Sequence, residues 1–181
     1  MINAHVVFEG VDRCGKSSLV DKYCVIEKPR HYFKMRVPTT LQESVEFYDD
    51  HLHRLQTSTE PTVWDRGLLS ELVYGPLYRP DECPAYRRRT LIEATRIPTK
   101  LPVIVVYVYP LWTDLMLPDE RPNADINAEL HRYSVVFDAI HWRKVAMTKH
   151  TISDGNRAWK NRDVSWEELR RLLLIGLGDA I

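Results

Sequence analysis

The sequence lacks net charge, is poor in cysteine and contains no long hydrophobic run. Its 25 Lys and Arg residues balance its 25 Asp and Glu residues, so no global basic field favours nucleic acid or an acidic membrane surface. Three consecutive arginines at 87–89 are a local exception and leave DNA binding open. No apolar run approaches the roughly 20 residues of a membrane span, so we expect no membrane partner.

The cysteines indicate neither a disulfide framework nor a metal site. Cys14, Cys24 and Cys83 are odd in number and lack the spacing of metal ligands, which is typical of reduced thiols in a cytosol. The sequence starts directly with a strand pattern, without the charged and apolar regions of a signal peptide. We therefore expect a cytoplasmic protein, located in the host cytoplasm if the chain is viral.

A phosphate-loop motif lies near the start of the sequence. Residues 5–19, HVVFEGVDRCGKSSL, contain the full GxxxxGK[ST] pattern with a strand pattern before it and a helical pattern after it. Its glycines let successive backbone N–H groups converge on phosphate oxygens, and the N-terminus of the helix adds partial positive charge. The motif predicts a nucleoside triphosphate site formed by Gly10, Val11, Asp12, Arg13, Cys14, Gly15, Lys16, Ser17 and Ser18.

Strand and helix patterns alternate along the rest of the chain. Strands are predicted at residues 6–8, 31–37, 62–64, 102–109 and 147–152, and the nearly continuous apolar run at 102–109 is typical of a central parallel strand. Helices are predicted from residue 18 to the turn before 29, at 41–55, 68–74, 85–97 and 128–145, and after a Ser165–Glu168 capping box. We expect one α/β domain, 1–181, of the P-loop NTPase type: a three-layer α/β/α sandwich around a parallel sheet of about five strands.

The phosphate loop alone does not separate GTPases, ATPases and small-molecule kinases. No NKxD base-reading motif occurs, which argues against a GTPase, and the chain is short for a motor or helicase ATPase. Arg36 and Arg66 lie at the ends of two predicted strands. Because phosphoryl transfer needs several fixed cations around two anionic groups, this pattern favours a small-molecule kinase over a non-catalytic nucleotide switch.

Three motifs resemble the thymidylate kinase family. FEGVDRCGKSS is similar to the family's phosphate loop, Arg36-Val37-Pro38 to its Arg-Phe-Pro element after the second strand, and Asp65-Arg66 to its Asp-Arg motif after the third. The resemblance implies an ATP- and Mg²⁺-dependent kinase with a deoxypyrimidine acceptor, for which a deoxynucleoside monophosphate such as dTMP is the first expectation. The family often forms homodimers, of which this sequence gives no independent indication.

The resemblance also implies roles on the donor side of the reaction. Lys16 and a Mg²⁺ ion on Ser17 would hold ATP, and Arg13 would lean over the transferring phosphoryl group. A lid is expected at about 117–127, where Arg121 is the one arginine that could close on the donor phosphates. A plain solvated loop is the alternative for this segment.

On the acceptor side, the resemblance implies that Arg36 and Arg66 bind the phosphate and that Asp12 contacts the deoxyribose hydroxyl. Arg36 could instead be a surface residue of its strand. Asp65 could orient Mg²⁺ through water or simply hold Arg66. Tyr74 is a candidate for stacking on the base.

Base recognition departs from the family pattern. The segment between Pro38 and Asp65 is short and lacks the helix whose aromatic and Arg side chains read thymine in the family. The obvious substitutes there are Phe47, Tyr48, Arg54 and Gln56, with Tyr74 and Tyr78 on the other side. The motifs therefore support phosphoryl transfer more strongly than thymine specificity.

Glu9 is compatible with a second kind of acceptor, a hydroxyl group. Some bacteriophage relatives phosphorylate hydroxymethyldeoxyuridine within DNA, a step of base hypermodification, and Glu9 could act there as the base for a hydroxyl acceptor. A monophosphate acceptor is already ionised and needs no base. The acceptor is thus expected to be a deoxynucleotide, either free or within DNA, with the free monophosphate preferred.

Overall fold

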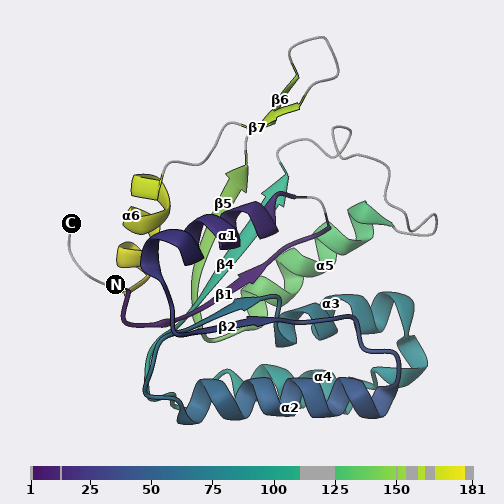
Figure 1. Cartoon of the computed structure of the whole chain (residues 1–181). Coiled ribbons are helices and arrows are strands. Elements are labelled where there is room, and N and C mark those ends of the chain that lie inside the picture. Colours follow the sequence, from purple (N-terminus) through teal and green to yellow (C-terminus); the bar gives the residue numbers. More distant parts are fainter. Residues whose placement is uncertain are drawn as a thin grey trace.

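A computed structural model of the chain describes residues 2–12, 14–110, 125–149, 151–153, 159–161 and 166–177. Five parallel strands form the central sheet in the order β2-β3-β1-β4-β5 (Figure 1). Their bounds are β1 (His5–Glu9), β2 (His31–Lys34), β3 (Thr62–Asp65), β4 (Val103–Pro110) and β5 (Arg143–Lys149). A separate antiparallel pair consists of β6 (Thr151–Ser153) and β7 (Trp159–Asn161).

Helices cover both faces of the sheet. They are α1 (Lys16–Glu27), α2 (Leu41–Thr57), α3 (Leu68–Tyr78), α4 (Ala85–Ala94), α5 (Ile126–Ala139) and α6 (Trp166–Leu177), with a 3₁₀ turn, η1 (Pro80–Glu82), after α3. In Figure 1, α1 lies in front of the sheet and α5 behind it. The expected P-loop α/β/α sandwich with a five-stranded parallel sheet is confirmed. None of the described helices combines the length and the apolar character that crossing a bilayer requires.

The core lies along the two central strands. Val6, Val7 and Phe8 of β1 are fully buried, as is the Ile104–Val106 stretch of β4 that pairs with them. Buried apolar side chains on both faces of these strands explain their nearly continuous hydrophobic runs. Because parallel strands carry their carboxyl ends to one edge, β1 and β3 deliver Glu9 and Asp65 side by side.

Two predicted boundaries in the first half of the chain are wrong. The strand predicted at 31–37 ends at Lys34. The helix predicted to stop at 74 continues through Pro76 to Tyr78. Pro76 lacks the N–H that would bond to the Leu72 carbonyl, but that oxygen accepts a hydrogen bond from Arg132 Nε of α5 at 3.2 Å. This tertiary contact compensates for the helical hydrogen bond that the proline cannot make.

The second half of the chain contains further differences. The helix predicted at 128–145 ends at Ala139, because residues 143–149 pair with β4 as strand β5. The final strand predicted at 147–152 is divided between β5 and β6, and the polar loop predicted at 154–163 contains β7. The last helix is present as α6, whereas Ser165 of its predicted capping box lies outside the described residues.

Candidate active site

The phosphate loop joins β1 to α1 through two glycines with positive φ. Gly10 has φ 152°, and a Cβ there would overlap with the carbonyl oxygen of Val108 on β4. Gly15 has φ 86° and caps the N-terminus of α1, which begins at Lys16. Both positions require glycine, since other residues rarely adopt this backbone or fit this space. The described part of the loop therefore leads into the N-terminus of α1, the end of a helix that attracts anions.

Cys14 is buried within this loop, and burial raises the pKa of its thiol. A buried thiol with a raised pKa is a poor nucleophile. This agrees with a small side chain filling the turn rather than a reactive cysteine.

A pocket of about 560 Å³ opens beside the loop. We call it the phosphate-loop pocket, and it is lined by Val11, Asp12, Gly15, Lys16, Ser17, Ser18, Lys34, Met35, Asp65 and Arg66. The predicted ATP-binding residues Gly10 and Cys14 lie next to this lining in the sequence. Arg13 and Arg121 of the same prediction, and most of the proposed lid, lie outside the described residues.

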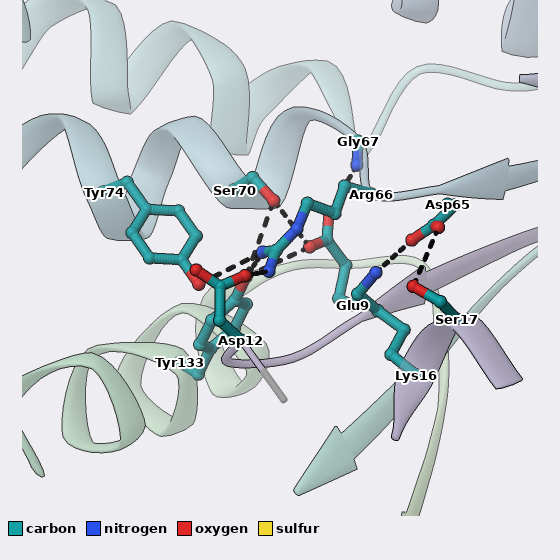
Figure 2. A network of polar contacts seen from close by, with 10 residues as sticks. All are labelled: Glu9, Asp12, Lys16, Ser17, Asp65, Arg66, Gly67, Ser70, Tyr74 and Tyr133. Carbon is teal, nitrogen blue, oxygen red and sulfur yellow. Dashed lines mark hydrogen bonds and ion pairs between the residues drawn. The ribbon is translucent and has the colours of Figure 1, made fainter. Parts of the chain in front are cut away.

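Lys16 and Ser17 both contact the carboxylate of Asp65 at the end of β3 (Figure 2). Lys16 Nζ forms a buried ion pair with Oδ1, and Ser17 Oγ donates to Oδ2 at 3.3 Å. The alternative in which Asp65 merely holds Arg66 is not what the structure shows, because Arg66 pairs with Asp12 instead. A hydroxyl and a carboxylate oxygen at this spacing fit Mg²⁺, which usually takes one or two protein oxygens beside substrate phosphates.

Arg66 projects between the loop and α3 from a strained backbone. Its φ is 72°, in the left-handed region, and its side chain is 17% exposed. One terminal nitrogen forms an ion pair with Asp12, and the other donates to the hydroxyls of Tyr74 and Tyr133 at 3.1 Å (Figure 2). Burial alone would lower the pKa of Arg66, but the surrounding phenol and carboxylate oxygens outweigh it, and the pKa is raised. The guanidinium stays charged and fixed in direction.

The turn that carries Arg66 is held by three successive backbone N–H groups. Arg66 N donates to the Phe8 carbonyl at 2.9 Å, and Gly67 N donates to Glu9 Oε1 at 2.7 Å. Leu68 N donates to Nδ1 of the buried His51 at 3.1 Å. A non-glycine residue with positive φ persists only where its surroundings determine it this fully. These bonds fix the direction in which Arg66 points.

Glu9 is enclosed behind Arg66 and does not line the phosphate-loop pocket. Its carboxylate accepts hydrogen bonds from Gly67 N at 2.7 Å, Ser70 Oγ at 2.9 Å and the Tyr133 hydroxyl at 3.2 Å (Figure 2). Burial raises the pKa of Glu9, and the nearby Arg66 charge opposes that shift. With its oxygens occupied by protein donors, Glu9 anchors the site, and this placement gives no support to a role as base.

A second pocket, of about 370 Å³, adjoins the first. We call it the tyrosine pocket, and it is lined by Asp12, Met35, Arg36, Val37, Pro38, Tyr48, Arg66, Ser70, Tyr74, Tyr78 and Arg79. Asp12, Met35 and Arg66 line both pockets. The predicted acceptor residues Asp12, Arg36, Arg66 and Tyr74 therefore meet around one pocket.

Each of the described cations proposed to bind phosphate already has a carboxylate partner. The pairs are Lys16–Asp65, Arg66–Asp12 and Arg36–Glu43. Arg36 is the exposed member, with 72% of its side chain accessible, and its guanidinium lies 4.9 Å from the centre of the Phe47 ring. An incoming phosphate would therefore exchange places with carboxylates at a site that is close to neutral.

Several predicted candidates lie away from both pockets. Arg54 pairs with Asp50 and lies over the ring of Phe33. Gln56 and Phe47 do not line either pocket. Of the three arginines at 87–89, the first two donate to backbone carbonyls and the third is exposed, so none of them reaches the site.

Other site residues were missed from the sequence. Tyr133 is buried, and its hydroxyl contacts Arg66 and Glu9. Ser70 lies in the first turn of α3, and its hydroxyl donates to Glu9 Oε2 at 2.9 Å, a contact that no local pattern indicates. His51 and Arg79 reach the site through tertiary contacts that no local pattern indicates.

Comparison with known proteins supports the fold of the chain. No family model matches the chain, and no curated protein matches it. Among solved structures, the YorR protein of Bacillus subtilis in complex with phosphorylated GDP is similar, with a TM-score of 0.61, 18% sequence identity and coverage of 80% of this chain and 85% of YorR. Deoxyadenosine kinase from M. mycoides, with products dCMP and a flexible dCDP bound, gives a TM-score of 0.48 and 13% identity over 79% of this chain and 88% of that one.

Proposed function

We propose that the protein is a P-loop phosphotransferase that moves the γ-phosphoryl group of ATP to a deoxypyrimidine nucleoside monophosphate, with dTMP as the first candidate. The observation that carries this proposal is the pair of adjoining pockets that share Asp12 and Arg66. One pocket contains the phosphate loop, and the other is fronted by arginine and walled by tyrosine. Donor and acceptor phosphates would meet at the shared residues.

On the donor side, the loop N–H groups and the N-terminus of α1 would bind the β- and γ-phosphates. The Lys16 ammonium would exchange its present partner, Asp65, for the outer phosphates of ATP. Those phosphates are anions and would lie beside the loop that precedes Lys16. Ser17 and Asp65 would hold Mg²⁺, which neutralises charge on the donor phosphates when bound.

On the acceptor side, Arg66 is aimed and fixed before the substrate arrives. Its two terminal nitrogens now contact Asp12, Tyr74 and Tyr133 and would form the planar fork for a phosphate that displaces Asp12, while Arg36 offers a second, exposed cation on the same pocket. Preorganised charge of this kind lowers the barrier to transfer between two anions. The tyrosine pocket would then receive the sugar and base.

The site favours a phosphate acceptor over a hydroxyl acceptor. A hydroxyl must lose a proton during transfer, and the carboxylate first considered for that task, Glu9, lines neither pocket. Glu9 therefore gives no support, as a general base, to phosphorylation of a hydroxymethylated nucleobase in DNA. The arginines at 87–89, which could have met a DNA backbone, also lie away from the site.

The test is transfer of labelled γ-phosphate from ATP to free deoxynucleoside monophosphates and, in parallel, to duplex DNA with and without hydroxymethyluracil. Label is expected in a nucleoside diphosphate. Lys16→Ala should lower kcat by about 10²- to 10³-fold, as expected for loss of one preorganised cation. The exposed Lys100→Ala is the matched control and should leave kcat unchanged.

Either of two results would overturn the proposal. Label retained only in DNA that carries hydroxymethyluracil would identify a DNA kinase instead. Turnover in Lys16→Ala equal to that of the wild type would show that the phosphate loop is not the donor site.

A further inference from the structure

The hydroxyl of Tyr133 lies between two side chains of opposite charge. It accepts a hydrogen bond from Nη1 of Arg66 at 3.1 Å and donates one to Oε2 of Glu9 at 3.2 Å (Figure 2). Tyr133 is 1% exposed and Glu9 is fully buried, so bulk water does not compete for either bond. The proposed transfer uses Arg66 directly, but it assigns no task to the two groups behind it.

The direction of these two bonds follows from the chemistry of the three groups. A guanidinium can only donate, and a phenol hydroxyl carries a single hydrogen. Oε1 of Glu9 accepts from Gly67 N at 2.7 Å, and Oε2 accepts from Ser70 Oγ at 2.9 Å. Because this carboxylate is surrounded by donors, it acts as the acceptor for the hydrogen of Tyr133 as well. The lone pairs of the Tyr133 hydroxyl are then left for Arg66.

The packing of α5 against α3 holds Tyr133 in place. Glu129, Arg132 and Tyr133 are spaced i, i+3 and i+4, so they share one face of α5. Oε1 of Glu129 accepts from the Tyr78 hydroxyl at 2.6 Å, and Nε of Arg132 donates to the Leu72 carbonyl at 3.2 Å. Both bonds attach this face of α5 to α3. The position of the Tyr133 hydroxyl is therefore set by the protein before any ligand binds.

Arg66 has one partner that an anion can replace and one that it cannot. Asp12 is 39% exposed and lines both pockets, so an acceptor phosphate can take its place beside Nη2 of Arg66. Tyr133 is buried and lines neither pocket. Its hydroxyl is also neutral, so it directs the guanidinium without cancelling the charge that attracts the phosphate. The bond to Tyr133 can therefore persist while Asp12 is exchanged.

We propose, on the premise of the function proposed above, that Glu9 and Tyr133 are positioning residues for the acceptor phosphate. Glu9 orients the hydroxyl of Tyr133, and that hydroxyl holds the guanidinium of Arg66 toward the arriving phosphate. A hydrogen bond to a charged group is stronger than one between neutral groups, and this one is formed in advance of binding. Neither residue touches the acceptor, so both act only through Arg66.

The first experiment compares dTMP with thymidine, which lacks the phosphate, in the wild type and in Tyr133→Phe. If another deoxynucleoside monophosphate proves to be the acceptor, that nucleotide and its nucleoside are used instead. The variant keeps the ring, which stacks on Tyr107 with centroids 5.3 Å apart, and removes only the hydroxyl. The Kd of dTMP, measured by calorimetry, should rise by about tenfold, the scale of one hydrogen bond to a charged group. The Kd of thymidine and the KM for ATP should stay close to the wild-type values, because Arg66 is assigned to the acceptor phosphate.

Tyr107→Phe is the matched control for this comparison. It removes a hydroxyl from the neighbouring buried ring, and that hydroxyl makes no described bond to Arg66 or Glu9. The Kd of dTMP should therefore equal that of the wild type.

A second experiment tests whether Glu9 acts through Tyr133. Glu9→Gln replaces an accepting oxygen by an amide donor, which disturbs the orientation of the Tyr133 hydroxyl, but it also removes a negative charge near Arg66. The two effects have opposite signs for phosphate binding, and a double-mutant cycle separates them. In the Tyr133→Phe background only the effect of charge remains. Relative to that background, Glu9→Gln in the wild type should weaken dTMP binding by about fivefold, as expected for coupled neighbours.

The outcomes separate this inference from the function on which it rests. Equal Kd values for dTMP in the wild type and in Tyr133→Phe would overturn the role of Tyr133, and so would an equal loss of thymidine binding, which would mean that the hydroxyl shapes the pocket. Equal effects of Glu9→Gln in both backgrounds would overturn the role of Glu9. Tyr133→Phe decides its own part even where Glu9→Gln does not fold. If the wild type transfers phosphate to no deoxynucleoside monophosphate, the proposed function fails and this inference fails with it.

Discussion

Arg36 differs from the other site cations because its partner belongs to the start of a helix. Glu43 lies in the first turn of α2 and accepts hydrogen bonds from Thr39 N at 2.7 Å and Thr39 Oγ1 at 2.8 Å. Those two bonds, and then the Arg36 charge, lower the pKa of Glu43. The carboxylate is therefore ionised and fixed beside Arg36. Any acceptor phosphate that binds Arg36 must compete with it.

Glu43→Gln should therefore lower the KM for the acceptor. Glutamine can still accept from Thr39, which preserves the helix start, but it no longer competes as a charge. Exposed ion pairs are weak, so the expected decrease is about twofold to fivefold, with the KM for ATP unchanged. The control is Glu46→Gln, one turn later on α2, where the carboxylate accepts a hydrogen bond from Gln42. An increase in the acceptor KM would mean that Glu43 positions Arg36 instead.

At the scale of elements, the β3–α3 turn controls where Arg66 points. Gly67 has an extended backbone that any residue could adopt, but a Cβ there would overlap with Cε1 of His51. The glycine is thus required by the close approach of a ring from α2. That ring also stacks on Trp64 of β3, with centroids 3.9 Å apart, so moving it away would disrupt this stacking.

Gly67→Ala should displace this turn and misdirect Arg66. We expect a loss of about 1–3 kcal/mol in the free energy of unfolding, as for other overpacked sites, and a larger rise in KM for the acceptor than for ATP. The second change His51→Asn removes Cε1 and keeps an acceptor for Leu68 N. Gly67→Ala/His51→Asn should therefore recover part of both losses, measured by urea unfolding and steady-state kinetics. Strictly additive losses in the double variant would contradict the contact.

The ends of elements show what the sequence could not predict. A proline after Gly75 is a normal helix stop, yet α3 continues because Arg132, about 60 residues away, satisfies the freed carbonyl of Leu72. This extension brings Tyr78 and Arg79 to the tyrosine pocket. Likewise, the apolar pattern after Ala139 suits a helix or a strand, and pairing with β4 decides for the strand. Such decisions depend on partners that are distant in the sequence.

For the whole molecule, the sheet and the residues at the carboxyl ends of its strands could be predicted from the sequence. The phosphate loop, Asp65 and Arg66 follow directly from local spacing, because a parallel sheet brings strand ends together. The enclosed position of Glu9 could not be predicted, since its donors come from the β3–α3 region and from Tyr133 on α5. Spacing indicates which residues can act, while burial decides which of them a ligand can reach.

Two buried histidines make the stability of the whole molecule sensitive to acid. His5 Nδ1 lies 2.9 Å from the Thr62 hydroxyl, His51 is stacked on Trp64, and the Nε2 atom of His51 is buried without a described partner. Burial lowers the pKa of His5 to about 4, and burial together with His5 lowers the pKa of His51 to about 3. Both rings are therefore neutral in the folded protein at pH values where the unfolded chain, with a pKa near 6.5, takes up protons.

The free energy of unfolding should consequently fall as the pH is lowered from about 6.5 toward 4, because the unfolded state then binds more protons than the folded state. Glu9, whose pKa is raised by burial, acts in the opposite direction, so the contribution of one histidine is best isolated by comparing a variant with the wild type.

His5→Asn retains an oxygen for Thr62 and does not titrate. Urea unfolding between pH 6 and 4.5 should show its slope reduced by about 1.4 kcal/mol per pH unit relative to the wild type. His53→Asn, at an exposed position on α2, should keep the wild-type slope. Equal slopes for His5→Asn and the wild type would show that His5 is protonated in the folded protein.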